Sequence, residues 1–393
     1  MPFNVAAVQE ALRAHGLDGW LLYDFQGSNP VAYRMAGMGA AGHLATRRWF
    51  YLIPASGEPR ALVHAIERYN LDHLPGTKTV YAGREQLVTG LASVVDGVTR
   101  VAMEYSPQCA IPYVSRVDAG TIELVRGLGL EVVSSGDLIQ QFEACWSEAA
   151  ITTHRAASAA LYRIKDRAFE SVTRRLLDGV PTTEYDIQQQ MVGWFADEGL
   201  VAESAPCVSA QENAGNPHYL ASASAHRVIR QHELVLLDLW GKLTTPGAVY
   251  ADITWIGFTG AQVPARMTQA FAAICGARDA AVEVVQDAAR AGRDVRGFEA
   301  DRAARRVLQE AGFGDAILHR TGHSLGENVH GNGAHLDDYE THDERRLLPG
   351  SGFTIEPGLY FKDFGVRTEI NMVWTGHGPE VTGPRQAAIV TLV

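Results

Sequence analysis

Four carboxylates lie inside runs that are otherwise apolar and strand-like, and they constrain the fold of this chain more than any other feature. They are Asp238 in LVLLDLWG, Asp252 in YADITWIG, Glu356 in FTIEPGLY and Glu369 in VRTEINMV. An ionised carboxylate in a buried strand is very costly unless it is paired or binds a cation. Arginines near these runs look too few to neutralise all four. The sequence therefore predicts that these strands meet around a divalent metal ion.

Histidines gather in the same part of the chain. Of the 14 histidines, five fall within one short stretch, far more than uniform scatter would place there: His319, His323, His330, His335 and His342. Carboxylates with an imidazole form an oxygen-rich ligand set that suits Mn²⁺, Co²⁺, Zn²⁺ or Fe²⁺, and we favour Mn²⁺. Four carboxylates exceed what one ion needs. We therefore expect two ions that share bridging carboxylates.

Short apolar runs alternate with helical patterns over the first 145 residues, which predicts an α/β domain. Strands are expected at WLLYD, WFYLIP, ALVHA, VAMEY and LEVVSS, and helices at 5–15 and 117–128. From Glu148 a helical pattern runs for about 30 residues behind a plausible N-cap, Ser147. Because a long helix commonly opens a new domain, we divide the chain into domains 1–145 and 146–393.

The second domain is also expected to mix strands and helices. Helical patterns cover 184–198, 264–291 and 297–311. The runs LVLLDLWG and ADITWIGFTG read as a hairpin joined by a turn at Pro246-Gly247, and AILHRTG, FTIEPGLYF and VRTEINMVW read as further strands. The overall prediction is a mixed α/β (α+β) fold.

Charge and composition exclude several kinds of partner. Acidic residues outnumber basic ones by 45 to 34, giving a net charge of −11, which argues against nucleic acid or an anionic membrane as partner. The sequence contains no apolar run long enough to span a bilayer, and its first residues do not resemble a signal peptide. The four cysteines are widely spaced, as expected of reduced thiols. We therefore expect a cytoplasmic protein.

Two short motifs suggest other chemistry. Gly37 to Gly42 fits G-x-G-x-x-G, but the residues that follow lead into a strand rather than a helix, so nucleotide binding is disfavoured. Gly322 to Gly326 fits G-x-S-x-G and would make Ser324 the nucleophile of a serine acyl hydrolase. The next stretch, ENVHGNGAHLDD, is too rich in glycine and asparagine to begin the required helix. The serine hydrolase stays open as an alternative.

The order of the motifs resembles the pita-bread metallopeptidases, which include aminopeptidase P, prolidase and methionine aminopeptidase. The matching features, in chain order, are His218-Tyr219, Asp238, Asp252, the run HRTGHSLGENVH, Glu356 and Arg367-Thr-Glu369. The resemblance implies a pita-bread catalytic domain over 146–393. It also implies that 1–145 is the non-catalytic creatinase/prolidase-like α/β domain of the aminopeptidase P and prolidase branch.

The same resemblance implies roles for individual residues. The implied metal ligands are Asp238, Asp252, His323, Glu356 and Glu369. The implied catalytic residues are His218, His330 and Glu356, and we assign substrate contacts to His319, Arg367 and His335. The implied enzyme is a homodimeric exopeptidase that uses a hydroxide bridging two metals to remove the residue before a proline.

Several positions depart from the family pattern. Trp240 stands where relatives have glycine, Trp255 where they have arginine, and the two aspartates are 252 − 238 = 14 apart instead of 11. No arginine occurs in 331–344 to hold a dipeptide's carboxylate, so the sequence favours aminopeptidase P-like cleavage of longer peptides over an Xaa-Pro dipeptidase. A catalytically silent binding module is a further alternative, and Arg367 is alternatively an ion-pair partner of Glu369.

Overall fold

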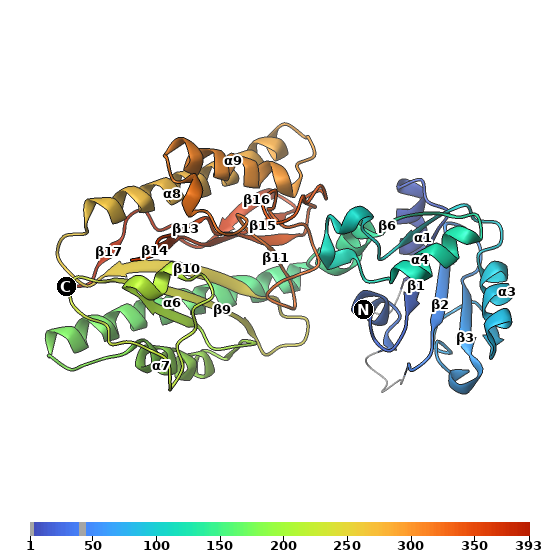
Figure 1. The fold of residues 1–393 in the computed structure, drawn as a ribbon, viewed down its shortest axis with the longest axis horizontal. Helices are drawn as coiled ribbons and strands as arrows, with labels where there is room; N and C mark the ends of the chain where they lie inside the picture. The colour runs from blue at the N-terminus through green and yellow to red at the C-terminus, as the bar shows by residue number, and fades with distance from the viewer. Residues whose placement is uncertain (1–3, 39–44) are drawn as a thin grey trace. The chain divides into compact units, whose positions relative to one another are not determined.

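The structure is a computed structural model that describes residues 4–38 and 45–393. The chain forms two compact units, Met1–Ile139 and Gln140–Val393, and the divide lies slightly before the boundary taken from the sequence. Both units mix helices and strands, as predicted (Figure 1). None of the helices in the described ranges is both long enough and apolar enough to cross a membrane.

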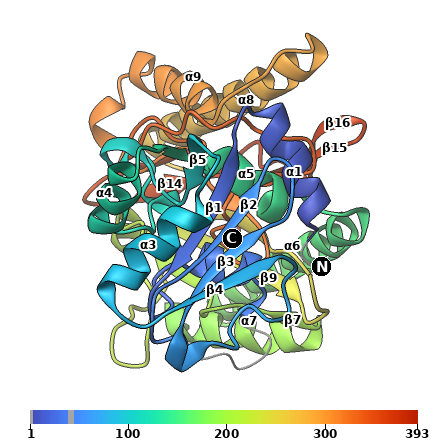
Figure 2. The ribbon, with the colours of Figure 1, turned by 90° about the vertical axis from the view of Figure 1, so that its right-hand side faces the viewer.

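The first unit is built on one six-stranded sheet with the strand order β4-β3-β2-β1-β5-β6. Figure 2 shows β2 between β1 and β3. The strands are β1 Gly19–Asp24, β2 Trp49–Pro54, β3 Arg60–His64, β4 Thr77–Tyr81, β5 Arg100–Met103 and β6 Glu131–Ser134. All five predicted strands are confirmed. Among the described strands of this unit only β4 was missed, because it is an edge strand whose first four residues are exposed and show no apolar pattern.

Helices pack against this sheet. They are α1 Val5–Ala14, α2 Pro30–Met35, α3 Arg84–Val94, α4 Ala119–Gly127 and α5 Gly136–Ile139. The sequence predicted α1 and α4 but not the others. Both β1 and β2 are buried at all six positions, as expected of central strands covered on both faces.

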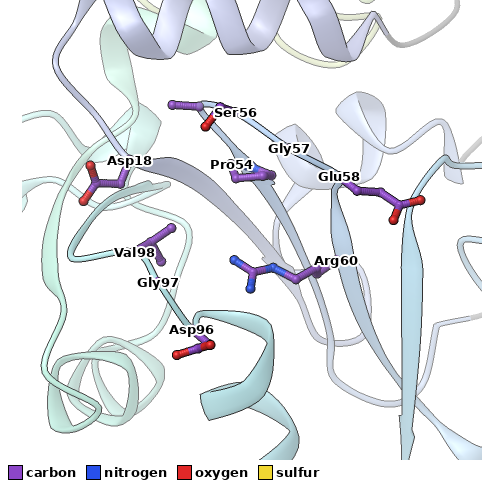
Figure 3. Close-up of a pocket in the computed structure, with 10 residues that line it drawn as sticks. Asp18, Pro54, Ser56, Gly57, Glu58, Arg60, Asp96, Gly97 and Val98 are labelled. Carbon is purple, nitrogen blue, oxygen red and sulfur yellow. The ribbon is translucent and has the colours of Figure 1, made fainter.

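The first unit also contains an open cavity of about 430 Å³, into which Arg60 points (Figure 3). Its acidic lining residues are Asp18, Glu58 and Asp96. Asp18 is already engaged, because it accepts hydrogen bonds from the Thr99 hydroxyl and from the backbone N–H groups of Thr99 and Arg100. No histidine or cysteine is among the described residues that line the cavity, so it does not combine the ligand types predicted for a metal site.

Four long helices flank the strands of the second unit, with α6 and α7 on one side and α8 and α9 on the other (Figure 1). Their bounds are α6 Glu148–Leu177, α7 Glu184–Asp197, α8 Ala265–Arg290 and α9 Gly297–Glu310. Each lies within two residues of its predicted range. The Ser147 side chain accepts a hydrogen bond from Ala150 N–H and so caps α6 as expected.

Two sheets carry the predicted carboxylates. The first contains β7 Leu200–Val201, β8 Cys207–Ala210, β9 Leu234–Leu243, β10 Ala251–Phe258 and β17 Val390–Thr391. The second contains β11 Ser324–Leu325, β12 Gly352–Ile355, β15 Ile370–Thr375 and β16 Gly378–Thr382, and a separate ribbon pairs β13 Gly358–Tyr360 with β14 Gly365–Arg367. The predicted hairpin of β9 and β10 is confirmed as an antiparallel pair.

Three of the predicted strands differ from the structure. AILHRTG is not a strand: Gly314–Ala316 forms a 3₁₀ turn, and the next strand begins at Ser324. The run FTIEPGLYF breaks after Ile355, where Pro357 has no N–H to continue a ladder. VRTEINMVW breaks at Thr368-Glu369, because Glu369 N–H donates to the Thr254 carbonyl of β10 instead of to a strand of its own sheet. Both breaks place a predicted metal ligand at the end of a strand.

The two faces of β10 have different surroundings. Asp252 and Thr254 face β14 and β15: Asp252 N–H donates to the Asn371 side chain over 2.9 Å. Trp255 alternates to the opposite face, as side chains do along a strand. There its ring lies 5.9 Å from the Tyr162 ring and 3.9 Å from the Lys165 Nζ of α6. This departure from the family pattern therefore lies on the face of β10 opposite the predicted metal ligands.

Candidate metal centre

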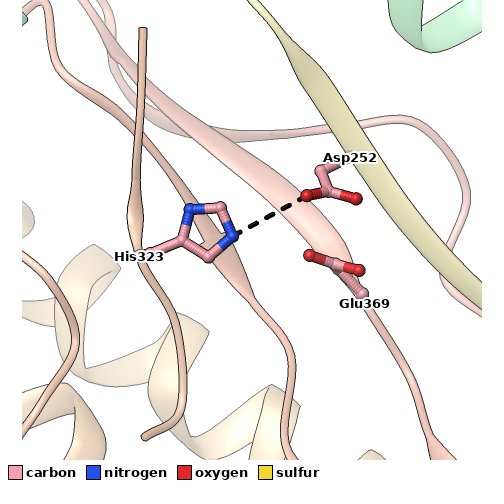
Figure 4. Close-up of side chains that lie close together, drawn as sticks. All are labelled: Asp252, His323 and Glu369. Carbon is pink, nitrogen blue, oxygen red and sulfur yellow. Dashed lines mark ion pairs between the residues drawn. The ribbon is translucent and has the colours of Figure 1, made fainter. Parts of the chain in front are cut away.

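Three of the five predicted metal ligands form a tight buried cluster. Asp252, His323 and Glu369 each offer one ligand atom, and these atoms lie within 4.8 Å of one another (Figure 4). The three residues are between 2% and 5% exposed. They come from β10, from the loop before β11 and from the break between β14 and β15, so the packing of the two sheets brings them together.

The charges of this cluster fit a cation. Burial raises the pKa of both Asp252 and Glu369 well above the usual range, and neighbouring carboxylates raise it further. Among the described residues, Asp252 Oδ1 is buried without a hydrogen-bond partner. A buried carboxylate oxygen with no donor beside other carboxylates is what a metal ion would satisfy.

His323 is prepared to act as a neutral ligand. Burial lowers its pKa to about 3, so the imidazole is uncharged near neutral pH. Its Nδ1 lies 3.1 Å from the Ser324 carbonyl oxygen, to which an Nδ1–H would donate. That bond leaves the lone pair on Nε2, which lies 3.7 Å from Asp252 Oδ2 and 3.5 Å from Glu356 Oε1. Glu356 therefore lies next to the cluster, and its carboxylate is as close to His323 Nε2 as that of Asp252.

Asp238 is not one of the three clustered residues, although its charge contributes to the raised pKa of Asp252 and Glu369, and it forms an ion pair with Arg367. The arginine is only 5% exposed, and its guanidinium also donates to the Thr254 hydroxyl and the Tyr360 hydroxyl, each over 3.1 Å. One alternative from the sequence is corrected here: the carboxylate that forms an ion pair with Arg367 is Asp238 rather than Glu369. Arg367 neutralises one of the four carboxylates, which agrees with the expectation that arginines are too few for all four.

Tyr360 is a member of the site that the sequence analysis missed. Its hydroxyl lies 2.7 Å from His319 Nε2 and accepts the bond from Arg367, so it links two of the predicted substrate residues. Burial raises its pKa to about 12. The sequence feature that could have pointed to Tyr360 is its position at the end of FTIEPGLY, four residues after Glu356. A tyrosine at the end of a strand is common and uncharged, so it did not stand out as a candidate.

The other predicted histidines lie at different depths. The His330 ring centroid is 4.5 Å from that of His323, so the two imidazoles are neighbours. His218 is exposed on the segment between β8 and β9, and its backbone N–H donates to the Asn216 side chain over 3.0 Å. His319 is half-buried and its Nδ1 lies 2.6 Å from the Arg320 carbonyl oxygen.

The prediction that His335 contacts substrate is not supported by its position. Its side chain is 0% exposed and its Nδ1 accepts a hydrogen bond from Ser324 N–H over 3.0 Å. Its own backbone N–H donates to Asp343 Oδ2. These bonds fix the loop after β11 from inside the fold, and the ring is covered by protein.

The serine hydrolase motif does not have the geometry that its chemistry needs. Ser324 is 1% exposed on β11, where its hydroxyl accepts a hydrogen bond from Gly333 N–H over 3.0 Å. A nucleophile elbow would instead expose this hydroxyl at a turn into a helix. In the G-x-G-x-x-G motif, residues 39–42 lie outside the described part of the chain.

Comparison with known proteins agrees with this geometry. A family model described as "Metallopeptidase family M24" matches residues 154–376. A Mycobacterium tuberculosis (strain H37Rv) protein named "Probable dipeptidase PepE" is 27% identical over 259 residues, which are 65% of this chain and 63% of that protein. The "Xaa-Pro dipeptidase" of Lactobacillus delbrueckii subsp. lactis is 32% identical over 172 residues, or 44% of this chain and 42% of the relative. The matched parts thus span less than two thirds of either relative.

Solved structures share the fold over nearly the whole chain. The crystal structure of dipeptidase PepE from Mycobacterium ulcerans aligns with a TM-score of 0.69 and 24% identity, covering 99% of this chain and 96% of that one. The X-Pro aminopeptidase from Thermotoga maritima aligns with a TM-score of 0.57 and 18% identity, covering 97% and 99%. The family match includes the whole cluster of Asp252, His323 and Glu369 together with Glu356 and Asp238. This chain belongs to the metallopeptidase family M24.

Proposed function

We propose that the protein is a metal-dependent exopeptidase that hydrolyses short peptides with proline at the second position. The observation that carries this proposal is the buried cluster of Asp252, His323 and Glu369, with its unsatisfied carboxylate oxygen. These residues would hold a divalent cation, with Glu356 beside them, and a second ion would have to share Asp238 with Arg367. The cation would polarise the scissile carbonyl and lower the pKa of bound water towards about 7.

Other residues of the chain would transfer the proton, stabilise the carbonyl oxygen and position the ligands. Glu356 would accept the proton that water loses as it attacks, and His330 and His218 would donate hydrogen bonds to the carbonyl oxygen as it gains charge. Arg367 would hold the Asp238 carboxylate in place through their ion pair. The proline nitrogen has no N–H and a fixed φ, so a site that accepts it must do without a backbone hydrogen bond at that position.

The direct test combines metal analysis with a peptide assay. We expect the purified chain to bind Mn²⁺ or Co²⁺ and to release the first residue of Xaa-Pro peptides only when metal is loaded. Metal binding without turnover would support the silent binding module instead. Metal stoichiometry tests whether Asp238 and its arginine leave room for two ions, and sedimentation of the same sample tests the homodimer that the family resemblance implies.

Replacing Ser324 by alanine is expected to change kcat/KM by less than about tenfold, because the hydroxyl is buried and bonded to Gly333 N–H. A chelator should instead abolish hydrolysis, and added Mn²⁺ or Co²⁺ should restore it. The measurement is kcat/KM for wild-type and variant proteins with and without chelator. A serine hydrolase would give the opposite pattern, with loss in the variant and little effect of chelation.

Dipeptides are expected to be better substrates than their one-residue extensions, in contrast to the preference drawn from the sequence. The names of the relatives above favour dipeptides. The sequence argument rested on the absence of arginine from 331–344. The two arginines that follow are engaged elsewhere, since Arg345 is bound bidentately by Asp343 and Arg346 pairs with Asp294. A cation close to the predicted histidines is instead Arg320, which is 9% exposed, lies 4.0 Å from Asp337 Oδ2 and lowers the pKa of His330 beyond the effect of burial.

The measurement is kcat/KM for an Xaa-Pro dipeptide, its amide and its one-residue extension, all with metal loaded. A charge-assisted pair to the terminal carboxylate is worth about 1.5–3 kcal/mol, so we expect about a tenfold or larger preference for the dipeptide over both. The amide is the matched control, because it removes the carboxylate without adding length. Equal rates for all three would favour the aminopeptidase.

A further inference from the structure

We infer that Glu184 is a positioning residue for His218, holding the segment 210–227 in the place where this histidine reaches the site. The inference rests on the proposed function, in which His218 contacts the substrate. Glu184 lies far from His218 in sequence, at the first position of α7, and nothing in its sequence surroundings marks it as unusual.

Glu184 is a fully buried carboxylate whose hydrogen bonds all lead to that segment. Its side chain is 0% exposed. It accepts five hydrogen bonds: from Ala210 N–H over 2.7 Å, from the Asn213 amide over 3.0 Å to each oxygen, from the Tyr219 hydroxyl over 2.5 Å and from Arg227 N–H over 2.9 Å. So many donors on one buried carboxylate offset its cost of desolvation.

The start of α7 is itself held firmly. Thr183 caps the helix, and Thr183 and Asp186 bond each other's backbone N–H groups in a capping box. Glu184 N–H donates to the Arg227 carbonyl over 3.0 Å, so helix and segment are joined in both directions. The carboxylate also lies at the helix N-terminus, where the helix dipole favours negative charge.

The donors flank His218 on both sides along the chain. Ala210 and Asn213 precede it, Tyr219 follows it directly, and Arg227 lies beyond. His218 itself is exposed, and its backbone N–H donates to the side chain of Asn216, only two residues away. The Tyr219 hydroxyl ties the residue next to His218 to Glu184, and the bonds from Ala210 and Arg227 N–H tie the backbone before and after it, so Glu184 restricts where the backbone that carries the His218 ring can lie. Glu184 thus sets the position of His218 without touching substrate.

The matching experiment is a double-mutant cycle with Glu184→Gln and His218→Ala in the metal-loaded full chain. Glutamine keeps the size of the side chain but turns one acceptor oxygen into a donor that faces other donors. We expect Glu184→Gln to lower kcat/KM about tenfold or more with metal content unchanged. In the His218→Ala background the same change should lower it less than about twofold, because the residue that Glu184 positions is gone.

Glu198→Gln, at the C-cap of the same helix, is the matched control, since the Glu198 side chain forms an ion pair with Arg163, and this variant is expected to leave kcat/KM unchanged. If Glu184→Gln lowers kcat/KM by the same factor with and without His218, the positioning role is overturned and Glu184 serves general folding.

Amide hydrogen exchange separates failure of this inference from failure of the proposed function. A wild-type chain that binds metal but hydrolyses no peptide would refute the proposed function alone. Exchange then decides: faster exchange across 213–219 in Glu184→Gln, with β9 and β10 unchanged, supports the role of Glu184 in holding this segment. Unchanged exchange across 213–219 overturns it.

Discussion

Replacing Asp252 by asparagine is expected to remove the bound metal and to lower kcat/KM by about a thousandfold or more, equivalent to about 4 kcal/mol of transition-state stabilisation. Asp252 is central to the cluster, since it lies beside both His323 and Glu369. Asparagine has nearly the same shape and retains the backbone bond from Asp252 N–H to Asn371. It lacks the negative charge that a divalent cation needs from its ligands.

The measurements are metal content, kcat/KM and the stability of the metal-free protein. We expect stability without metal to be no lower than in the wild type, because burial and neighbouring carboxylates already disfavour the Asp252 charge. Loss of activity with retained stability therefore identifies a lost ligand rather than a folding defect. Asp287→Asn on the exposed face of α8 is the control and should change none of the three quantities. Full metal content and wild-type turnover in Asp252→Asn would refute the metal assignment.

The second large effect is a loss of stability in mild acid caused by His154. This histidine of α6 is 0% exposed, and its ring nitrogens lie 2.8 Å from the Tyr250 carbonyl and 2.8 Å from the Thr382 hydroxyl. Burial lowers its pKa from 6.5 to about 4. As pH falls below 6.5, His154 binds a proton in the unfolded chain but stays neutral in the folded chain, so the free energy of unfolding decreases between pH 6.5 and about 4. Between pH 7 and pH 5 the loss should be about 2 kcal/mol.

The test compares urea unfolding of wild-type protein and His154→Gln across this pH range. Glutamine keeps one donor and one acceptor but has no titratable proton, so the variant should lose about 2 kcal/mol less than wild type between pH 7 and pH 5. The slope with pH is the readout, because the substitution also lowers stability at neutral pH through altered packing. His377→Gln, at an exposed position, should keep the wild-type slope. Parallel curves for wild type and His154→Gln would contradict the prediction.

The elements of the fold were largely predictable because local periodicity determines them. The helices α6 to α9 and the hairpin of β9 and β10 follow from apolar spacing, a capping serine and glycine stops, all of which act within a few residues. The edge strand β4 was missed because it buries too little to show a pattern. The break after Ile355 was missed although Pro357, which cannot continue a ladder, is visible in the sequence. The break at Thr368-Glu369 was missed because it arises where the chain leaves its own sheet to contact β10.

The residues that needed an explanation were visible in the sequence: carboxylates in apolar strands and a cluster of histidines, which are costly to bury unless something compensates them. How each of them is compensated depends on the packing of distant parts of the chain. Packing of the two sheets joins Asp252 to His323 and Glu369, while Asp238 is paired with Arg367 and His335 is buried. Alternation along a strand fixes which side chains share a face. Which faces meet across more than a hundred residues depends on sheet packing, and no local pattern encodes it.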